Sequence, residues 1–211
     1  GAILYLKRYA ELAEKMAAEA ETDLQKKNLT RIADSCAWLT HDKPRTFFDA
    51  VQLLWIAQEI MMAENVPASE SLGRMDVYLA PYYEKDKAEG ILTYNEASEI
   101  LDALWIKFSG NLHSYQAITV SGTTADGKTF VNDLTYLIME STRKLKFDQP
   151  LIDFRYTDTM PQRLWMEVVE LIKTGTGFPG IFYDPICMRA KMSTGQSEED
   201  ARNYAIIGCV E

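Results

Sequence analysis

The end of the chain places a thiol and a carboxylate two positions apart. An apolar run, 204–207, leads into Gly208, Cys209, Val210 and Glu211, and this pattern predicts a buried strand. Side chains alternate along a strand, so Cys209 and Glu211 would point to the same side. A thiol can give and take a hydrogen atom, while a carboxylate can take a proton. In a barrel interior, the thiol could form a radical and the carboxylate could move a proton.

Each of these two residues also has an ordinary interpretation. A cysteine in an apolar strand is more often a small core residue than a reactive group. A buried Glu211 without a task or a partner would be costly, and burial would raise its pKa toward the range that suits proton transfer near neutral pH. Alternatively, the strand has reached solvent at Glu211, and the carboxylate is simply hydrated.

Composition narrows the class of protein. The 211 residues are 47% hydrophobic and carry a net charge of −9, which favours a packed core and argues against nucleic acid or an anionic membrane as partner. No apolar run reaches the length of about 18 residues that a membrane span needs. The three cysteines lack metal-ligand spacing, and the two histidines are too few for a His-based metal site. We therefore expect a chain without metal from a reducing cytoplasm.

The elements that must position the thiol change in character along the chain. Residues 1–110 are mainly helical in pattern, whereas residues 111–211 alternate between strand and helix. Such alternation predicts parallel strands joined by helices. Glycines at 175 and 177 follow a helix and indicate a helix end rather than a nucleotide-binding loop. The predicted helices are 2–39, 46–64, 76–87, 93–108, 132–146, 161–173 and 185–192; the predicted strands are 117–120, 151–156, 181–183 and 204–211, and 65–74 is irregular.

Gly208-Cys209-Val210-Glu211 resembles the thiyl-radical motif of the glycyl radical enzymes, the pyruvate formate-lyase superfamily. The likeness covers almost the whole chain, because further segments resemble successive family segments in the right order. These segments are 49–55, 73–76, 90–97, 105–107, 132–137 and 174–179.

The resemblance implies a partial ten-stranded α/β barrel with a largely helical N-terminal half and about half of the strands. It implies that Cys209 is the hydrogen-abstracting thiol, that Glu211 is the acid/base, and that the loop after Cys209 threads the barrel. The glycyl radical would lie on a C-terminal Arg-Val-X-Gly-Tyr loop, which these residues lack. We therefore expect residues 1–211 to be an internal fragment that is inactive alone and, with strand edges exposed, prone to associate.

The resemblance also implies partners and a location for the full-length protein. An activating enzyme that uses S-adenosylmethionine and an iron–sulfur cluster would install the radical under anaerobic conditions. The full-length protein would be a homodimer acting on a small molecule, in the cytoplasm or within a bacterial microcompartment.

The residue before the thiol, Gly208, limits which class of reaction the resemblance implies. Pyruvate formate-lyase carries adjacent cysteines, the first of which accepts the acyl group, but here that position is Gly208. The motif instead resembles the eliminating branch, which breaks C–O, C–N or C–S bonds and includes dehydratases and isethionate sulfite-lyase. The alternatives left open are arylacetate decarboxylation, acyl transfer as in formate C-acetyltransferase, and an inactive truncated product.

Two further residues correspond to substrate-facing positions of the family. Ser69 matches the second residue of a His-Ser pair that holds substrate hydroxyls in diol dehydratases, but the preceding position is Ala68. Tyr115 matches an aromatic residue that forms a wall of the eliminase pocket, and its hydroxyl could bond substrate. Ser69 is equally well explained as an ordinary loop hydroxyl. An aromatic residue before a strand, such as Tyr115, is more often a plain core residue.

Overall fold

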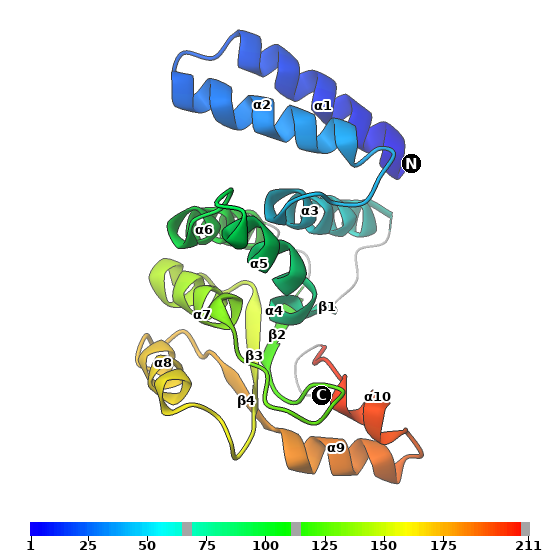
Figure 1. Ribbon diagram of the computed structural model, residues 1–211, viewed down its shortest axis with the longest axis vertical. Helices are drawn as coiled ribbons and strands as arrows, with labels where there is room; N and C mark the ends of the chain where they lie inside the picture. Colours follow the sequence, from blue (N-terminus) through cyan, green and yellow to red (C-terminus); the bar gives the residue numbers. More distant parts are fainter. Residues whose placement is uncertain (65–68, 111–114, 208–211) are drawn as a thin grey trace. The chain divides into compact units, whose positions relative to one another are not determined.

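The computed structural model describes residues 1–64, 69–110 and 115–207 of the chain (Figure 1). The chain divides into two compact units. Unit 1 comprises residues 1–66 and 82–91, and unit 2 comprises residues 67–81 and 92–211. The prediction that residues 1–211 form an internal part of one larger domain stays a prediction.

Unit 1 is helical. It contains α1 (Ala2–Ala18), α2 (Asp23–Trp38), α3 (Phe47–Glu64) and most of α5 (Ala80–Ala88). The predicted helix 2–39 is two helices, because the Thr22 hydroxyl accepts a hydrogen bond from the Gln25 N–H at 3.1 Å and starts α2 as an N-cap. The apolar core of this unit is formed by Leu6, Ala10, Cys36, Leu39 and Ile56.

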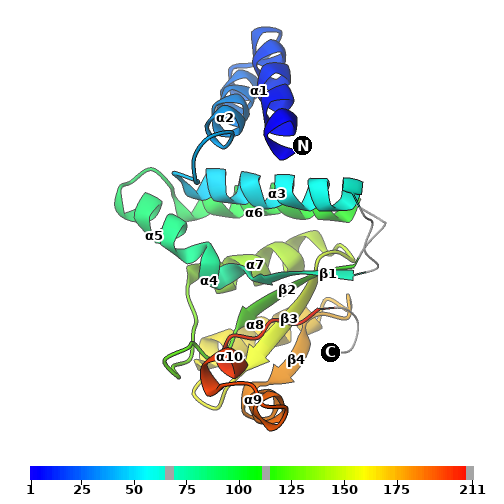
Figure 2. The same ribbon diagram turned by 90° about the vertical axis from the view of Figure 1, so that its right-hand side faces the viewer.

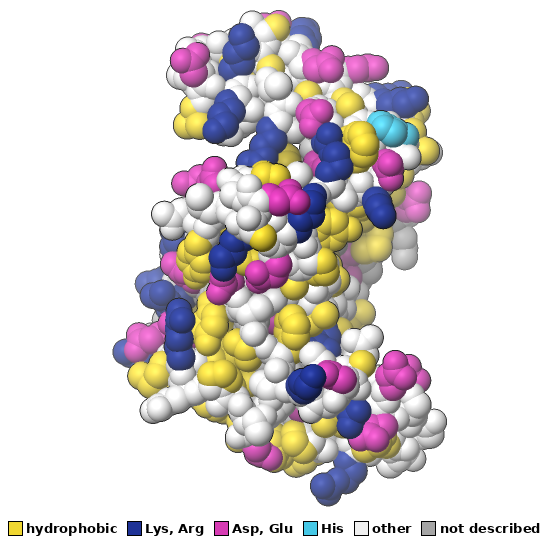
Figure 3. All heavy atoms as spheres, in the orientation of Figure 1, with side chains coloured by type: hydrophobic (Ala, Val, Ile, Leu, Met, Phe, Trp, Pro, Cys, Tyr) yellow, Lys and Arg dark blue, Asp and Glu magenta, His cyan; other side chains and the backbone are white. Residues whose placement is uncertain are grey.

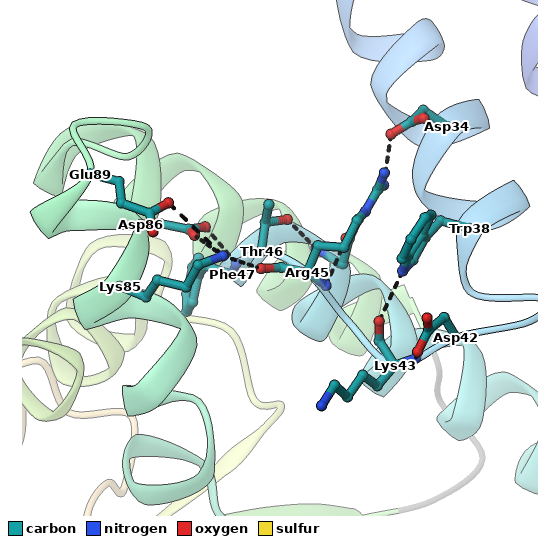
Figure 4. A network of polar contacts seen from close by, with 11 residues as sticks. Asp34, Trp38, Asp42, Lys43, Arg45, Thr46, Phe47, Lys85, Asp86 and Glu89 are labelled. Carbon is teal, nitrogen blue, oxygen red and sulfur yellow. Dashed lines mark hydrogen bonds and ion pairs between the residues drawn. The ribbon is translucent and has the colours of Figure 1, made fainter.

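Carboxylate side chains of unit 1 make hydrogen bonds and ion pairs at the start of α3 (Figure 4). The Arg45 guanidinium lies 2.7 Å from Asp34 Oδ2 and 2.9 Å from Asp49 Oδ2, and so links α2 to α3. Asp86 of α5 accepts the Phe47 N–H at 2.7 Å. This satisfies one of the N–H groups that the first turn of a helix leaves unpaired.

Unit 2 contains a parallel sheet with the strand order β1-β2-β3-β4 (Figure 2). Its strands are β1 (Ser69–Arg74), β2 (Tyr115–Ser121), β3 (Leu151–Tyr156) and β4 (Gly180–Tyr183). Its helices are α4 (Met75–Tyr78), α6 (Tyr94–Gly110), α7 (Asp133–Leu145), α8 (Gln162–Ile172), α9 (Asp184–Ser193) and α10 (Glu198–Arg202). The predicted helix 76–87 is therefore divided into α4 and α5.

The prediction that 65–74 is irregular is wrong for its described part, because Ser69–Arg74 forms β1. This strand has no apolar alternation and holds its conformation by pairing with β2. Its register slips by one residue: Ser71 pairs with Ala117, but Arg74 pairs with Thr119. The extra residue is a bulge that brings Arg74 onto the same face of the sheet as Thr119.

The two faces of the sheet differ in chemistry. One face packs on helices: Phe154 lies 5.7 Å from Trp165 of α8, ring centre to ring centre, and Ile118 and Ile152 are fully buried. Figures 1 and 2 show α7 and α8 on this side and the segment after α10 on the other. The opposite face, here called the inner face, carries polar side chains.

Hydrophobic side chains also gather on the surface over α7 and α8 (Figure 3). Met166, Val169 and Ile172 of α8 are 54%, 43% and 49% exposed.

Among the described residues, no helix combines the length and apolarity that crossing a bilayer requires.

Candidate functional site

The inner face presents four buried polar residues in two register pairs. Thr119 of β2 pairs with Asp153 of β3, and Ser121 pairs with Arg155. Thr119, Ser121 and Arg155 are fully buried, and Asp153 is 8% exposed. Polar side chains in such a place need partners, because each loses its hydration on folding.

Arg155 finds its partner in Asp184, at the start of α9. Its Nε–H donates to Asp184 Oδ1 at 2.7 Å and its Nη2 donates to Asp184 Oδ2 at 2.9 Å, in a two-pronged ion pair in which both side chains are fully buried. The Tyr204 hydroxyl donates to Asp184 Oδ1 at 2.7 Å, and its ring centre lies 3.8 Å from the guanidinium carbon. Burial, together with this carboxylate, raises the pKa of Tyr204.

The same guanidinium holds the chain segment that leads to Cys209. Arg155 Nη1 donates to the Tyr204 carbonyl at 2.9 Å, and Nη2 donates to the Arg202 carbonyl at 2.8 Å. Two residues further on, the Ile206 N–H donates to Thr119 Oγ1 at 2.9 Å. The segment therefore passes from Arg155 to Thr119, antiparallel to the strands and toward their amino ends (Figure 2).

The predicted terminal strand is wrong over its described part, since residues 203–207 form no strand. Side chains of the inner face satisfy the Tyr204 carbonyl and the Ile206 N–H in place of a strand ladder. Tyr204 and Ile206 of the apolar run are buried, as its composition indicates, whereas Ile207 is 46% exposed, and the run lies over the inner face of the sheet.

A second buried cluster supports the turn after β2. Asp76 Oδ2 accepts the Ser121 N–H at 2.7 Å and the Thr135 hydroxyl at 2.8 Å. Arg74 donates to the carbonyls of Ser121 and Thr123, each at 3.0 Å. Burial raises the pKa of Asp76 to about 6, against the opposing effect of these hydrogen bonds.

Asp153 lies beside this arrangement with little compensation for its burial. Its Oδ2 has no hydrogen-bond partner among the described residues, and desolvation raises its pKa to about 6. Its register partner on β4 is Gly180. A Cβ added at Gly180 would lie 3.0 Å from Asp153 Oδ1, so the glycine leaves room for the carboxyl group.

The structure brings together two of the four predicted site residues. Ser69 and Tyr115 are register partners at the amino ends of β1 and β2, and Tyr115 shares the inner face with Thr119 because side chains alternate along the strand. Ser69 Oγ is buried and has no hydrogen-bond partner among the described residues, whereas Tyr115 is 53% exposed. Cys209 and Glu211 lie outside the described residues.

Sequence reasoning missed Arg155, Asp153 and Asp184. The sequence does indicate a polar face, because Asp153 and Arg155 occupy alternate positions of the otherwise apolar strand 151–156 and so point to the same side. Nothing local indicates that Asp184, on another element, completes the pair. Across the described ranges, no three His, Cys, Asp or Glu side chains are grouped as a metal ion would need.

Comparison with known proteins agrees with this α/β architecture. The whole chain, residues 1–211, matches the family described as Pyruvate formate lyase-like, and the chain belongs to that family. The isethionate sulfite-lyase of Nitratidesulfovibrio vulgaris is 35% identical over 99% of the chain. The glycerol-bound, B12-independent glycerol dehydratase from Clostridium butyricum has a TM-score of 0.94 and 32% identity over 100% of the chain.

A third match is a crystal structure of a glycyl radical enzyme from Archaeoglobus fulgidus, with a TM-score of 0.93 and 31% identity over 100% of the chain. These matches confirm the predicted family and fold class. The chain spans 27% of the length of the sulfite-lyase, 28% of the dehydratase and 29% of the archaeal enzyme.

Proposed function

We propose that the protein containing this chain is a glycyl radical lyase of the dehydratase-like branch, acting on a small substrate by C–O, C–N or C–S elimination. The observation that carries this proposal is the family match over all 211 residues, with relatives that are lyases and dehydratases. The position of Gly208, where acyl-transferring members have a second cysteine, favours elimination over acyl transfer.

Cys209 is the proposed hydrogen-transfer residue. A glycyl radical on a C-terminal segment supplies the unpaired electron by taking the thiol hydrogen. The Cys209 sulfur then takes a hydrogen atom from a substrate carbon, which leaves an S–H bond and a carbon radical. After elimination, the product radical takes that hydrogen back and restores the sulfur radical. The buried inner face keeps water away from such intermediates.

Glu211 is the proposed acid/base. It takes a proton from the substrate as the neighbouring group leaves, and then gives the proton to the leaving group or to water, so charge and atoms balance. The described segment that precedes Glu211 lies over the inner face, because the Ile206 N–H donates to Thr119 Oγ1.

Ser69 and Tyr115 are the proposed substrate-binding residues. They lie side by side in register at the strand ends toward which the Cys209 segment runs. The Ser69 hydroxyl is buried without a partner among the described residues. It is therefore available to a polar substrate group, which would offset its lost hydration.

Membership of the family supports a proposal for the partners and the location of the full-length protein. We propose a small-molecule substrate, a radical-installing enzyme that uses S-adenosylmethionine and an iron–sulfur cluster, and a full-length homodimer in the cytoplasm or a bacterial microcompartment.

The test begins with the DNA downstream of Glu211. An in-frame Arg-Val-X-Gly-Tyr motif supports the proposal, whereas a nearby stop codon overturns enzymatic activity for this polypeptide. The full-length protein, activated without oxygen, is then assayed with diols, hydroxyproline and isethionate, beside Cys209→Ser. Turnover that disappears in the variant supports the proposal. Turnover that survives in Cys209→Ser overturns the role of the thiol.

A further inference from the structure

The carbonyls that Arg155 holds belong to one segment. Arg202 and Tyr204 precede Cys209 by seven and five positions, and Arg155 donates to the backbone carbonyl of each. Its other two hydrogen bonds go to Asp184. Among the described residues, the hydrogen bonds of the Arg155 side chain thus serve either the ion pair or the segment that precedes the thiol.

The ion pair has a fixed geometry. A guanidinium is planar, and when two of its N–H groups grip a carboxylate the directions of the others are set. Asp184 is itself held, since Oδ1 accepts the Tyr204 hydroxyl and Oδ2 accepts the Thr123 N–H at 2.6 Å. The pair therefore connects the end of β2, the start of α9 and the segment 202–204 in a single arrangement.

Gly122 gives the guanidinium its space. It has φ +91°, and a Cβ added there would lie 2.5 Å from Arg155 Nε. The side chain of Arg155 thus crosses directly over the glycine after β2.

We propose that the Arg155–Asp184 pair is a positioning device that fixes the course of residues 202–206 and so sets where Cys209 is presented. This inference rests on the proposed function and adds two positioning residues to it. Hydrogen transfer needs close approach, and a displacement of about 1 Å can cost about 100-fold in rate. Loosening two carbonyls of the leading segment would therefore slow transfer.

The experiment follows the thiol without substrate. In D2O the Cys209 thiol carries deuterium, which it gives to the glycyl radical carbon. When the sulfur radical then takes the original hydrogen back, deuterium remains on the glycine and the split EPR signal collapses. The rate of collapse, measured on the activated full-length protein, reports how well the thiol meets the glycine.

Arg155→Lys is the test variant, because it keeps the charge but loses the planar fork. We expect an undiminished radical yield, collapse slowed at least about 10-fold, kcat lowered in parallel, and KM within about twofold of the parent value. Arg74→Lys is the matched control, since Arg74 is also buried and also donates to two backbone carbonyls, but at the turn after β2. The Arg74→Lys variant should melt at a lower temperature than the parent, yet its EPR signal should collapse in D2O at the parent rate.

Exchange at the parent rate in Arg155→Lys overturns the positioning role. If that variant fails to fold, Asp184→Asn gives the same decision, because it keeps the shape while weakening the pair. Equal slowing in Arg74→Lys also overturns the proposal, since the effect would then follow stability. Failure of the proposed function is distinguishable: the parent protein would form no radical, or Cys209→Ser would exchange as fast as the parent.

Discussion

Ser69 and Tyr115 face each other across the first two strands of the sheet, as register partners of a parallel pair. In the sequence they are separated by two helices of unit 2 and one of unit 1. Pairing of β1 with β2 places a buried hydroxyl that has no hydrogen-bond partner among the described residues beside a phenol at the same end of the inner face. This juxtaposition supports the proposal that the two residues bind a polar substrate.

Replacing Tyr115 by Phe should lower kcat/KM about 5- to 10-fold, because one substrate hydrogen bond is worth about 1 kcal/mol. The free energy of unfolding should not change, since the side chain is 53% exposed. Steady-state kinetics of the activated full-length protein beside urea unfolding will check both. Tyr94→Phe is the control, as Tyr94 is also exposed and donates only to Glu140. An equal loss in both variants would contradict a specific role for Tyr115.

Asp153 should make the protein less stable as pH rises. Burial raises the pKa of Asp153 to about 6 from 3.8, so the folded state binds its proton more tightly than the unfolded state does. The stabilisation is complete below pH 3.8 and is lost as pH rises to 6. At pH 8, Asp153→Asn should gain up to about 3 kcal/mol, at 1.36 kcal/mol for each pKa unit.

The Asp153 prediction is checked by the unfolding free energy of parent and variant at pH 4 and pH 8. Asp148→Asn serves as the control, because Asp148 is exposed. A gain that is equal at both pH values would mean that the amide acts through packing and not through charge.

Much of the fold was predictable from local patterns. The helix 46–64 and the strand 151–156 agree with the structure to within one residue, because each depends on the spacing of apolar residues nearby in the sequence. β1 was not predictable, since its polar residues and Gly73 form a strand only by pairing with β2. The Arg155–Asp184 pair joins residues 29 positions apart, which no local pattern encodes.

Gly122→Ala should be costly. The new Cβ would lie 2.5 Å from Arg155 Nε and 2.7 Å from Arg155 Cβ, and the residue has φ +91°. Overpacking and backbone strain together should cost about 2–4 kcal/mol. Gly73→Ala separates the two effects, because Gly73 has φ +70° but nothing within 4 Å of the added atom. It should lose only about 1 kcal/mol, and thermal melts that rank the two variants otherwise would contradict the close approach.

Glu211→Gln tests the type of reaction. An elimination that needs an acid/base at this position should slow by about 100- to 10,000-fold, whereas acyl transfer would survive the change. The rates of product release by the activated parent and variant give the comparison. The glycyl radical signal of the two should be equal, which ensures that the loss lies in the reaction and not in activation.

The slipped register of β1 has a consequence for length variation. Ser71 pairs with Ala117 and Arg74 with Thr119, so three steps along one strand match two along the other. Deleting either Leu72 or Gly73 would restore regular alternation, two steps against two, and Arg74 would stay opposite Thr119 on the inner face. Three steps in regular pairing would instead put Arg74 opposite Val120, on the face that packs on the helices, and the hydrogen bonds that it donates to Ser121 and Thr123 would be lost. The bulge therefore absorbs one residue of strand length, and this local irregularity decides which side of the sheet carries a positive charge.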